Sequence, residues 1–95
     1  MSQAPDPPEL VLYSRATCEP CTEARLSLQW ALEERAARGE LVPIVREVDV
    51  DGDPDLRERY GALVPVVVIG ASELALVSSG RQLRAFLAAA LPRLA

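Results

Sequence analysis

Two cysteines three positions apart carry most of the chemistry that this sequence offers. Cys18 and Cys21 are the only cysteines among 95 residues, and the chain contains no histidine. Without an imidazole, Ser/His/Asp and Cys/His hydrolases, His-ligated zinc enzymes and histidine proton shuttles are excluded. Sulfur chemistry remains, because two thiols separated by two residues on one helical face are close enough to form a reversible disulfide.

Both cysteines stand at the start of a predicted helix over residues 18–38. Small and apolar side chains recur there at three- and four-residue steps and form one face: Cys21, Ala24, Leu28, Ala31 and Leu32. Thr17 is the expected N-cap, and Gly39 is a stop signal. The helix N-terminus favours a thiolate at Cys18 and lowers the pKa of that thiol below about 8.5. Cys18 is therefore the predicted nucleophile, and Cys21, one turn farther in, is the predicted resolving thiol.

The elements around this helix predict an α/β fold. Four strands are expected, at residues 10–13, 41–50, 65–69 and 73–77. The first is predicted to be a buried central strand, and Pro43 confines the second to an edge or delays its start. Two more helices are expected, over residues 54–60 and from Ser78 or Ser79 to Pro92. The order βαβ then ββα predicts a mixed four-stranded sheet with helices on both faces.

Composition and charge bound the domain and its partners. Apolar residues make up 49% of the chain and charged residues 25%, which is typical of one globular domain. We place it at residues 9–95, after a flexible, proline-rich leader at 1–8. The net charge of −4, with no lysine, argues against a nucleic-acid partner. The sequence shows neither a signal-peptide pattern nor a membrane-spanning apolar run, so we expect a cytoplasmic protein with no membrane partner.

Two segments resemble glutaredoxins of the thioredoxin superfamily. The first is residues 13–21, Tyr-Ser-Arg-Ala-Thr-Cys-Glu-Pro-Cys, which follow a predicted strand, open a helix and resemble the glutaredoxin active-site segment. The second is residues 60–65, Tyr-Gly-Ala-Leu-Val-Pro, which resemble the segment ending in the cis-proline of that superfamily. Together with the order of elements, the resemblance covers residues 9–91. It implies a thioredoxin-like fold and a dithiol that reduces disulfides.

The resemblance also implies roles for residues near the cysteines. By the family pattern, the Val64–Pro65 peptide bond is cis and lies beside the cysteines, and the Val64 backbone is free to pair with an extended thiol substrate. Arg15 holds the position of a basic residue that meets a carboxylate of glutathione, and Thr17 joins the implied substrate-binding residues. The implied substrate is a disulfide in a protein or a low-molecular-weight compound. The implied partner that supplies electrons is glutathione, acting as a co-substrate, or thioredoxin reductase. The resemblance implies no tightly bound cofactor.

The sequence departs from the glutaredoxin pattern at three places. Glu19 and Pro20 stand where glutaredoxins have Pro and Tyr, and the Glu19 carboxylate opposes ionisation of Cys18. Pro20 before the second cysteine is the thioredoxin arrangement, although Thr17 replaces the thioredoxin Trp. Residues 78–81, Ser-Ser-Gly-Arg, replace a Gly-Gly pair and the acids that hold the γ-glutamyl end of glutathione. Thiol–disulfide exchange survives these departures better than glutathione specificity does.

Several alternatives stay open. One alternative to the oxidoreductase is a non-enzymatic thioredoxin-fold interaction module. Another is a dimer that ligates an iron–sulfur cluster through Cys18. A closed zinc site would need carboxylates besides the two cysteines, and the acidic run at 49–55 lacks the EF-hand spacing, so no metal ligands are assigned. A solvated Arg15 and a trans Pro65 are the alternatives at those positions. Trp30 is expected to be a half-buried packing residue or an interface contact.

Overall fold

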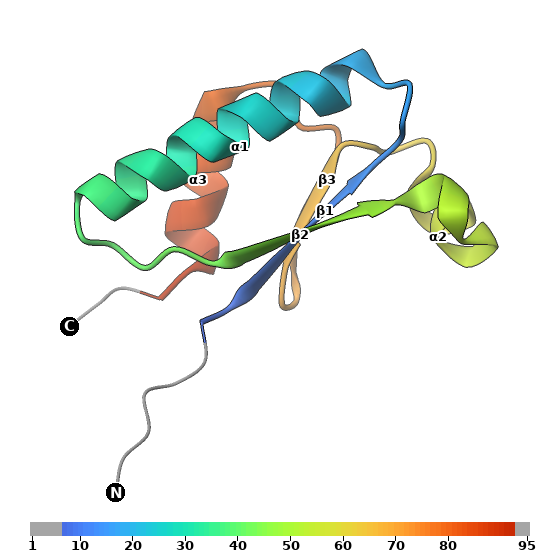
Figure 1. The fold of residues 1–95 in the computed structure, drawn as a ribbon. Coiled ribbons are helices and arrows are strands. Elements are labelled where there is room, and N and C mark those ends of the chain that lie inside the picture. Colours follow the sequence, from blue (N-terminus) through green and yellow to red (C-terminus); the bar gives the residue numbers. More distant parts are fainter. Residues whose placement is uncertain (1–6, 93–95) are drawn as a thin grey trace, which may run out of the picture.

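The computed structural model describes residues 7–92, which form one mixed sheet and three α-helices (Figure 1). The elements follow in the order β1 (Glu9–Ser14), α1 (Glu19–Ala37), β2 (Ile44–Asp49), the 3₁₀ turn η1 (Val50–Gly52), α2 (Pro54–Tyr60), β3 (Val66–Ile69), β4 (Ser72–Leu74) and α3 (Gly80–Ala90). The predicted βαβ-ββα order is confirmed.

The sheet has the strand order β2-β1-β3-β4, with β1 in an interior position. β1 runs parallel to β2, with Leu12 opposite Glu47, and antiparallel to β3, with Tyr13 opposite Val66. β3 and β4 form an antiparallel hairpin. The sheet is therefore mixed and four-stranded, and β1 is the buried interior strand that its apolar run predicted.

α1 and α3 lie together against one face of the sheet (Figure 1). The face of α1 that carries Cys21 and Ala24 is buried there, which confirms the face predicted from its spacing. The core on this side is formed by Leu10, Leu12, Ala24, Leu28, Ala31, Val67, Ile69, Val77, Leu83, Leu87 and Leu91. Burial of this apolar surface is the main force that holds both helices on the sheet.

A smaller core lies on the opposite face, at the end of the sheet where η1 and α2 pack. Val50, Tyr60 and Val66 are buried in it. The ring of Tyr60 stacks on Tyr13, with 4.4 Å between the ring centroids and 22° between the ring planes. The prediction of helices on both faces is confirmed, although α2 covers only this end (Figure 1).

Three strands are shorter than their predicted ranges, β3 by only one residue, since it begins at Val66. β2 begins at Ile44, because Pro43 has no N–H to donate to the ladder, whereas the Ile44 N–H donates to the Pro8 carbonyl at 2.9 Å. The prediction of a strand over 73–77 is wrong in extent, because Leu76 has a φ of 52° and interrupts the extended chain. Most of the predicted leader, residues 1–6, lies outside the described residues.

Of the local predictions on α1, one is wrong and one is wrong in part, and one on α3 is confirmed. Cys18 rather than Thr17 is the N-cap of α1, because the Cys18 sulfur accepts the Cys21 N–H. Trp30 is not a half-buried packing residue, since 62% of it is exposed, and its other expected role, as an interface contact, stays a prediction. Ser79 caps α3 by accepting the Gln82 N–H at 3.2 Å. No helix within residues 7–92 is long and apolar enough to cross a membrane.

The core beneath α3 gives a test of this packing. We expect Leu83→Ala to lower the free energy of unfolding by about 2–5 kcal/mol, because Leu83 is 0% exposed and its loss leaves a cavity. Ile44→Ala, on edge strand β2 and 58% exposed, should cost less than about 1 kcal/mol. Urea unfolding of both variants measures the difference, and equal losses would contradict the assigned packing.

Candidate functional site

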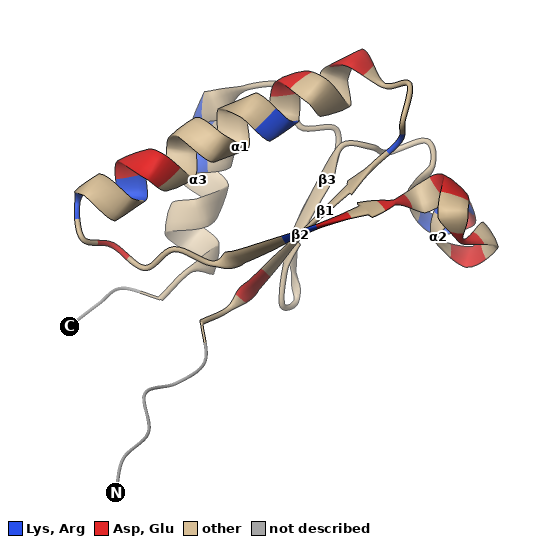
Figure 2. Ribbon diagram, in the orientation of Figure 1, with Lys and Arg blue, Asp and Glu red and all other residues tan. Residues whose placement is uncertain are grey.

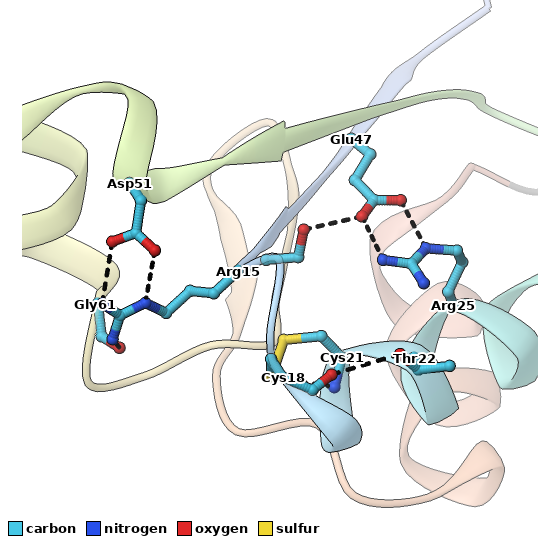
Figure 3. Close-up of a disulfide and its surroundings, with 9 residues drawn as sticks. Arg15, Cys18, Cys21, Thr22, Arg25, Glu47, Asp51 and Gly61 are labelled. Carbon is cyan, nitrogen blue, oxygen red and sulfur yellow. Dashed lines mark hydrogen bonds and ion pairs between the residues drawn. A yellow bond between two sulfur atoms is a disulfide. The ribbon is translucent and has the colours of Figure 1, made fainter.

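A disulfide joins Cys18 and Cys21 at the amino end of α1 (Figure 3). Their Cα atoms are 5.2 Å apart, within the range that a disulfide bridges without backbone movement. Cys18 is partly exposed, whereas Cys21 is 0% exposed on the core face of α1. Cys18 is therefore the more exposed cysteine of the pair.

The first turn of α1 concentrates hydrogen-bond donors around Cys18. Its Sγ accepts the Cys21 N–H at 3.2 Å, and its carbonyl accepts the Thr22 N–H at 3.2 Å. Pro20 is tolerated in this turn, because the first N–H groups of a helix have no acceptor within the helix. Glu19 follows Cys18 directly and places a carboxylate in the same turn, which favours the helix but opposes a thiolate.

The Val64–Pro65 segment reaches the same end of the sheet as the cysteines. Tyr13 is opposite Val66, so the chain before β3 runs beside the chain that leaves β1 toward Cys18. The Val64–Pro65 peptide bond is cis, as the resemblance implied, and Pro65 is fully buried. Among the described residues, the Val64 N–H and carbonyl have no hydrogen-bond partner. This backbone is available to an extended ligand.

The side chain of Arg15 points away from the disulfide and pairs with Asp51 (Figure 3). Its Nε and Nη2 donate to the two Asp51 oxygens at 3.0 and 2.9 Å, and its Nη1 donates to the Gly61 carbonyl at 3.4 Å. Hydrogen bonding and charge from Arg15 hold the pKa of Asp51 below its ordinary value. The carboxylate that Arg15 meets thus belongs to the chain itself, and the contact ties the loop before α1 to the loop before β3.

A second ion pair joins α1 to β2 on the other side of the cysteines. Glu47 accepts hydrogen bonds from Arg25 Nε at 2.8 Å and Nη2 at 2.6 Å, and from the Ser14 hydroxyl at 2.8 Å (Figure 3). Ser14 is only 3% exposed. The Arg25 hydrogen bonds, aided by the Ser14 hydroxyl, lower the pKa of Glu47 although partial burial opposes this.

The structure thus brings the cysteines and the Val64–Pro65 segment to one end of the sheet. The side chain of Arg15 points away from the cysteines, toward Asp51. Thr17 is exposed next to Cys18 and takes part in no hydrogen bond among the described residues. Sequence reasoning missed four residues of the surrounding network: Arg25, Glu47, Asp51 and Gly61. Their contacts follow from the strand register, since Ser14 pairs with Asp49 and the chains that continue from both strands meet.

No group of three or more His, Cys, Asp or Glu side chains within residues 7–92 is arranged to hold a metal ion. The chemistry that the described site offers is that of its two sulfurs.

Comparison with known proteins gives one family and a set of related structures. The model of the Glutaredoxin-like domain (DUF836) family matches residues 9–90. Target protein XcR50 from X. campestris is 34% identical in its X-ray structure, with a TM-score of 0.70 over 86% of this chain and 99% of that chain. Protein Ne2328 from Nitrosomonas europaea is 26% identical, with a TM-score of 0.55 over 79% of this chain and 84% of that chain.

The structural likeness extends to thioredoxins. Chloroplastic thioredoxin z is 25% identical, with a TM-score of 0.61 over 88% of this chain and 78% of that chain. Among curated proteins there is no significant match. The thioredoxin-like, glutaredoxin-type fold inferred from the sequence is therefore confirmed.

The Arg25–Glu47 pair predicts a pH-dependent stability. Because the folded-state pKa of Glu47 is lowered from 4.5, its stabilisation is fully present above about pH 4.5 and is lost as the pH falls through the lowered value. We expect Arg25→Met to lower the free energy of unfolding by up to about 1 kcal/mol at neutral pH, and by less near pH 3. Urea unfolding at both pH values measures this, with Glu58→Gln on α2 as control. A loss that does not shrink at low pH would show that packing, not charge, is responsible.

Proposed function

Because the chain belongs to the Glutaredoxin-like domain (DUF836) family, we propose that it is a dithiol–disulfide oxidoreductase that uses Cys18 and Cys21. The observation that carries the proposal is the unequal exposure of the two cysteines. Cys18 is partly exposed at the helix N-terminus, while Cys21 is fully buried one turn away. This arrangement suits a pair in which one sulfur attacks and the other resolves.

The proposed reaction begins with both cysteines reduced. The Cys18 thiolate attacks one sulfur of a substrate disulfide, and that bond breaks as the new Cys18–substrate bond forms. The departing substrate sulfur leaves as a thiolate and takes up a proton. Cys21 then loses its proton and attacks Cys18 Sγ, which releases the second substrate thiol. Two electrons pass from the protein to the substrate, and the Cys18–Cys21 disulfide is the product state.

The amino end of α1 supports the attacking role of Cys18. The Cys21 N–H that bonds Cys18 Sγ, together with the positive end of the helix, stabilises negative charge on this sulfur. We expect these groups to lower the pKa of the reduced Cys18 thiol, against the opposing charge of Glu19. With no histidine in the chain, these groups of the helix end replace the base that other thiol enzymes use.

Substrate positioning is assigned to the segment before β3. An extended peptide that pairs with the free Val64 backbone would lie beside Cys18, as in strand addition. Return to the dithiol state needs an external thiol reductant, for which we propose glutathione or a thioredoxin-reductase system. Thr17, exposed beside Cys18, is proposed to contact the same substrate.

A passive interaction module is the competing reading, and redox behaviour separates the two. A dithiol potential of roughly −200 to −300 mV would allow turnover with cytosolic thiols. A shared iron–sulfur cluster would instead require Cys18 of the reduced protein to ligate iron as a thiolate. Anaerobically purified protein without visible absorption would remove the cluster reading.

Replacement of the resolving thiol gives the main test. We expect Cys21→Ser to accumulate a mixed disulfide on Cys18 when it is mixed with a disulfide substrate, because no second thiol can release it. Mass spectrometry of the intact protein identifies the adduct, and Cys18→Ser is the matched control that should form none. Absence of an adduct on Cys21→Ser, or an ordinary thiol titration of Cys18, would reject the proposed function.

A further inference from the structure

The charges near the cysteine pair leave an acidic surface. Arg15 and Arg25 are each paired with a carboxylate of the chain, so neither offers a free positive charge. Glu19 and Glu23, by contrast, are exposed and take part in no ion pair or side-chain hydrogen bond among the described residues. Figure 2 shows this acidic beginning of α1 in red. The solvent side of the first two turns of α1 is therefore negatively charged.

A groove of about 490 Å³ adjoins this acidic surface and extends along α1. Pro20, between the two cysteines, lines one end, and Glu23 lies on its rim. Trp30 and Leu26 line it farther along α1, where they are 62% and 48% exposed, and the buried Val77 lies beneath. Two large apolar side chains are thus open to solvent in a groove that begins at Pro20, on the helix that carries the cysteine pair, which is typical of a contact surface.

The wall of the groove opposite α1 is polar but uncharged. Ser78 and Ser79 form it, and their hydrogen bonds are internal. Ser79 Oγ accepts the Gln82 N–H at 3.2 Å, and the Gln82 side-chain carbonyl accepts the Ser78 N–H at 2.7 Å. Arg81 follows on α3 but does not line the groove. Glu23 is therefore the charged side chain of the lining.

A second groove, of about 420 Å³ between α1 and β2, lacks this combination. Arg25 and Glu47 line it and neutralise each other. Its lining also includes Glu33, which takes part in no ion pair among the described residues, but it includes neither Pro20 nor any other residue of the first turn of α1. The groove toward Trp30 is the one that joins apolar surface, uncompensated acid and the cysteine end of α1.

We propose that this groove selects the substrate of the oxidoreductase: a disulfide in a protein or peptide segment with a basic residue next to its reactive cysteine and an apolar side chain beyond it. The inference rests on the proposed function. The basic residue meets Glu19 and Glu23, and the apolar side chain covers Trp30 and Leu26. Glutathione carries two carboxylates and one ammonium group, so its net negative charge is repelled by the same acids.

The test uses reduced protein in single turnover, so that no reductase is needed. Three probes are compared: two peptides that differ only in Arg or Glu beside a single cysteine, with Leu beyond it, and glutathione itself. Each is supplied as its mixed disulfide with pyridine-2-thiol, whose release is followed by absorbance. We expect the Arg peptide to react about five- to tenfold faster than the Glu peptide and faster than the glutathione probe. The preference should shrink as salt is added.

Variants assign the preference to the groove. Glu23→Gln should reduce the Arg/Glu preference by about two- to fivefold. Trp30→Ala and Leu26→Ala should each slow the reaction with the Arg peptide by at least about fivefold. Neither variant should slow the reaction with an Arg peptide in which Ser replaces Leu. Glu58→Gln on α2 and Ile44→Ala on β2 are the matched controls, since Glu58 takes part in no ion pair within residues 7–92 and Ile44 is 58% exposed. Both should leave the rates unchanged.

The outcomes separate this inference from the function on which it rests. Equal rates for the two peptides, or a faster reaction of the glutathione probe, overturn the substrate class while the Cys18 adduct of Cys21→Ser still stands. No reaction of reduced protein with any probe overturns both proposals. A preference that survives Glu23→Gln, Trp30→Ala and Leu26→Ala places the selectivity elsewhere and overturns the assignment to the groove.

Discussion

The interior position of β1 determines where the whole candidate site is built. β1 is parallel to β2 and antiparallel to β3, so the carboxyl ends of β1 and β2 meet the amino end of β3. The cysteine loop, the η1 turn and the Val64–Pro65 segment all leave the sheet at this end. A one-residue slip of β1 would exchange the faces of its side chains and separate Ser14 from Glu47 and Tyr13 from Tyr60. The apolar residues of β1 thus fix the register on which the site depends.

The sequence predicted features that lie within a single helix or strand, but it did not predict the side-chain contacts between elements. The spacing of Cys21, Ala24 and Leu28 predicted the buried face of α1, and the resemblance of residues 60–65 implied the cis bond at Pro65. The N-cap was misassigned because Thr17 is an ordinary capping residue, whereas the structure gives that role to a cysteine sulfur. The partner of Arg15 depends on the register of β1 against β2, which periodicity alone does not specify.

The absence of lysine makes arginine the source of every side-chain cation, and this shapes the surroundings of the site. A guanidinium binds a carboxylate through two parallel hydrogen bonds, as Arg15 does with Asp51 and Arg25 with Glu47. Both pairs bridge separate segments and orient the ends of the strands around the cysteines. The same pairing removes two positive charges from the surface that a substrate would meet, so the acids of α1 determine its sign.

In the proposed reaction, Glu19 would link the choice of substrate to the reactivity of Cys18. Its carboxylate directly follows Cys18, and in the reduced protein we expect it to oppose the stabilisation of a thiolate by the helix N-terminus. A basic residue that docks beside Glu19 offsets this charge, so thiolate formation at Cys18 becomes more favourable when the proposed substrate is bound. An anionic disulfide has the opposite effect, because it adds a second negative charge near the sulfur. A neutral side chain at position 19 would therefore make Cys18 more reactive toward every disulfide and less able to distinguish among them.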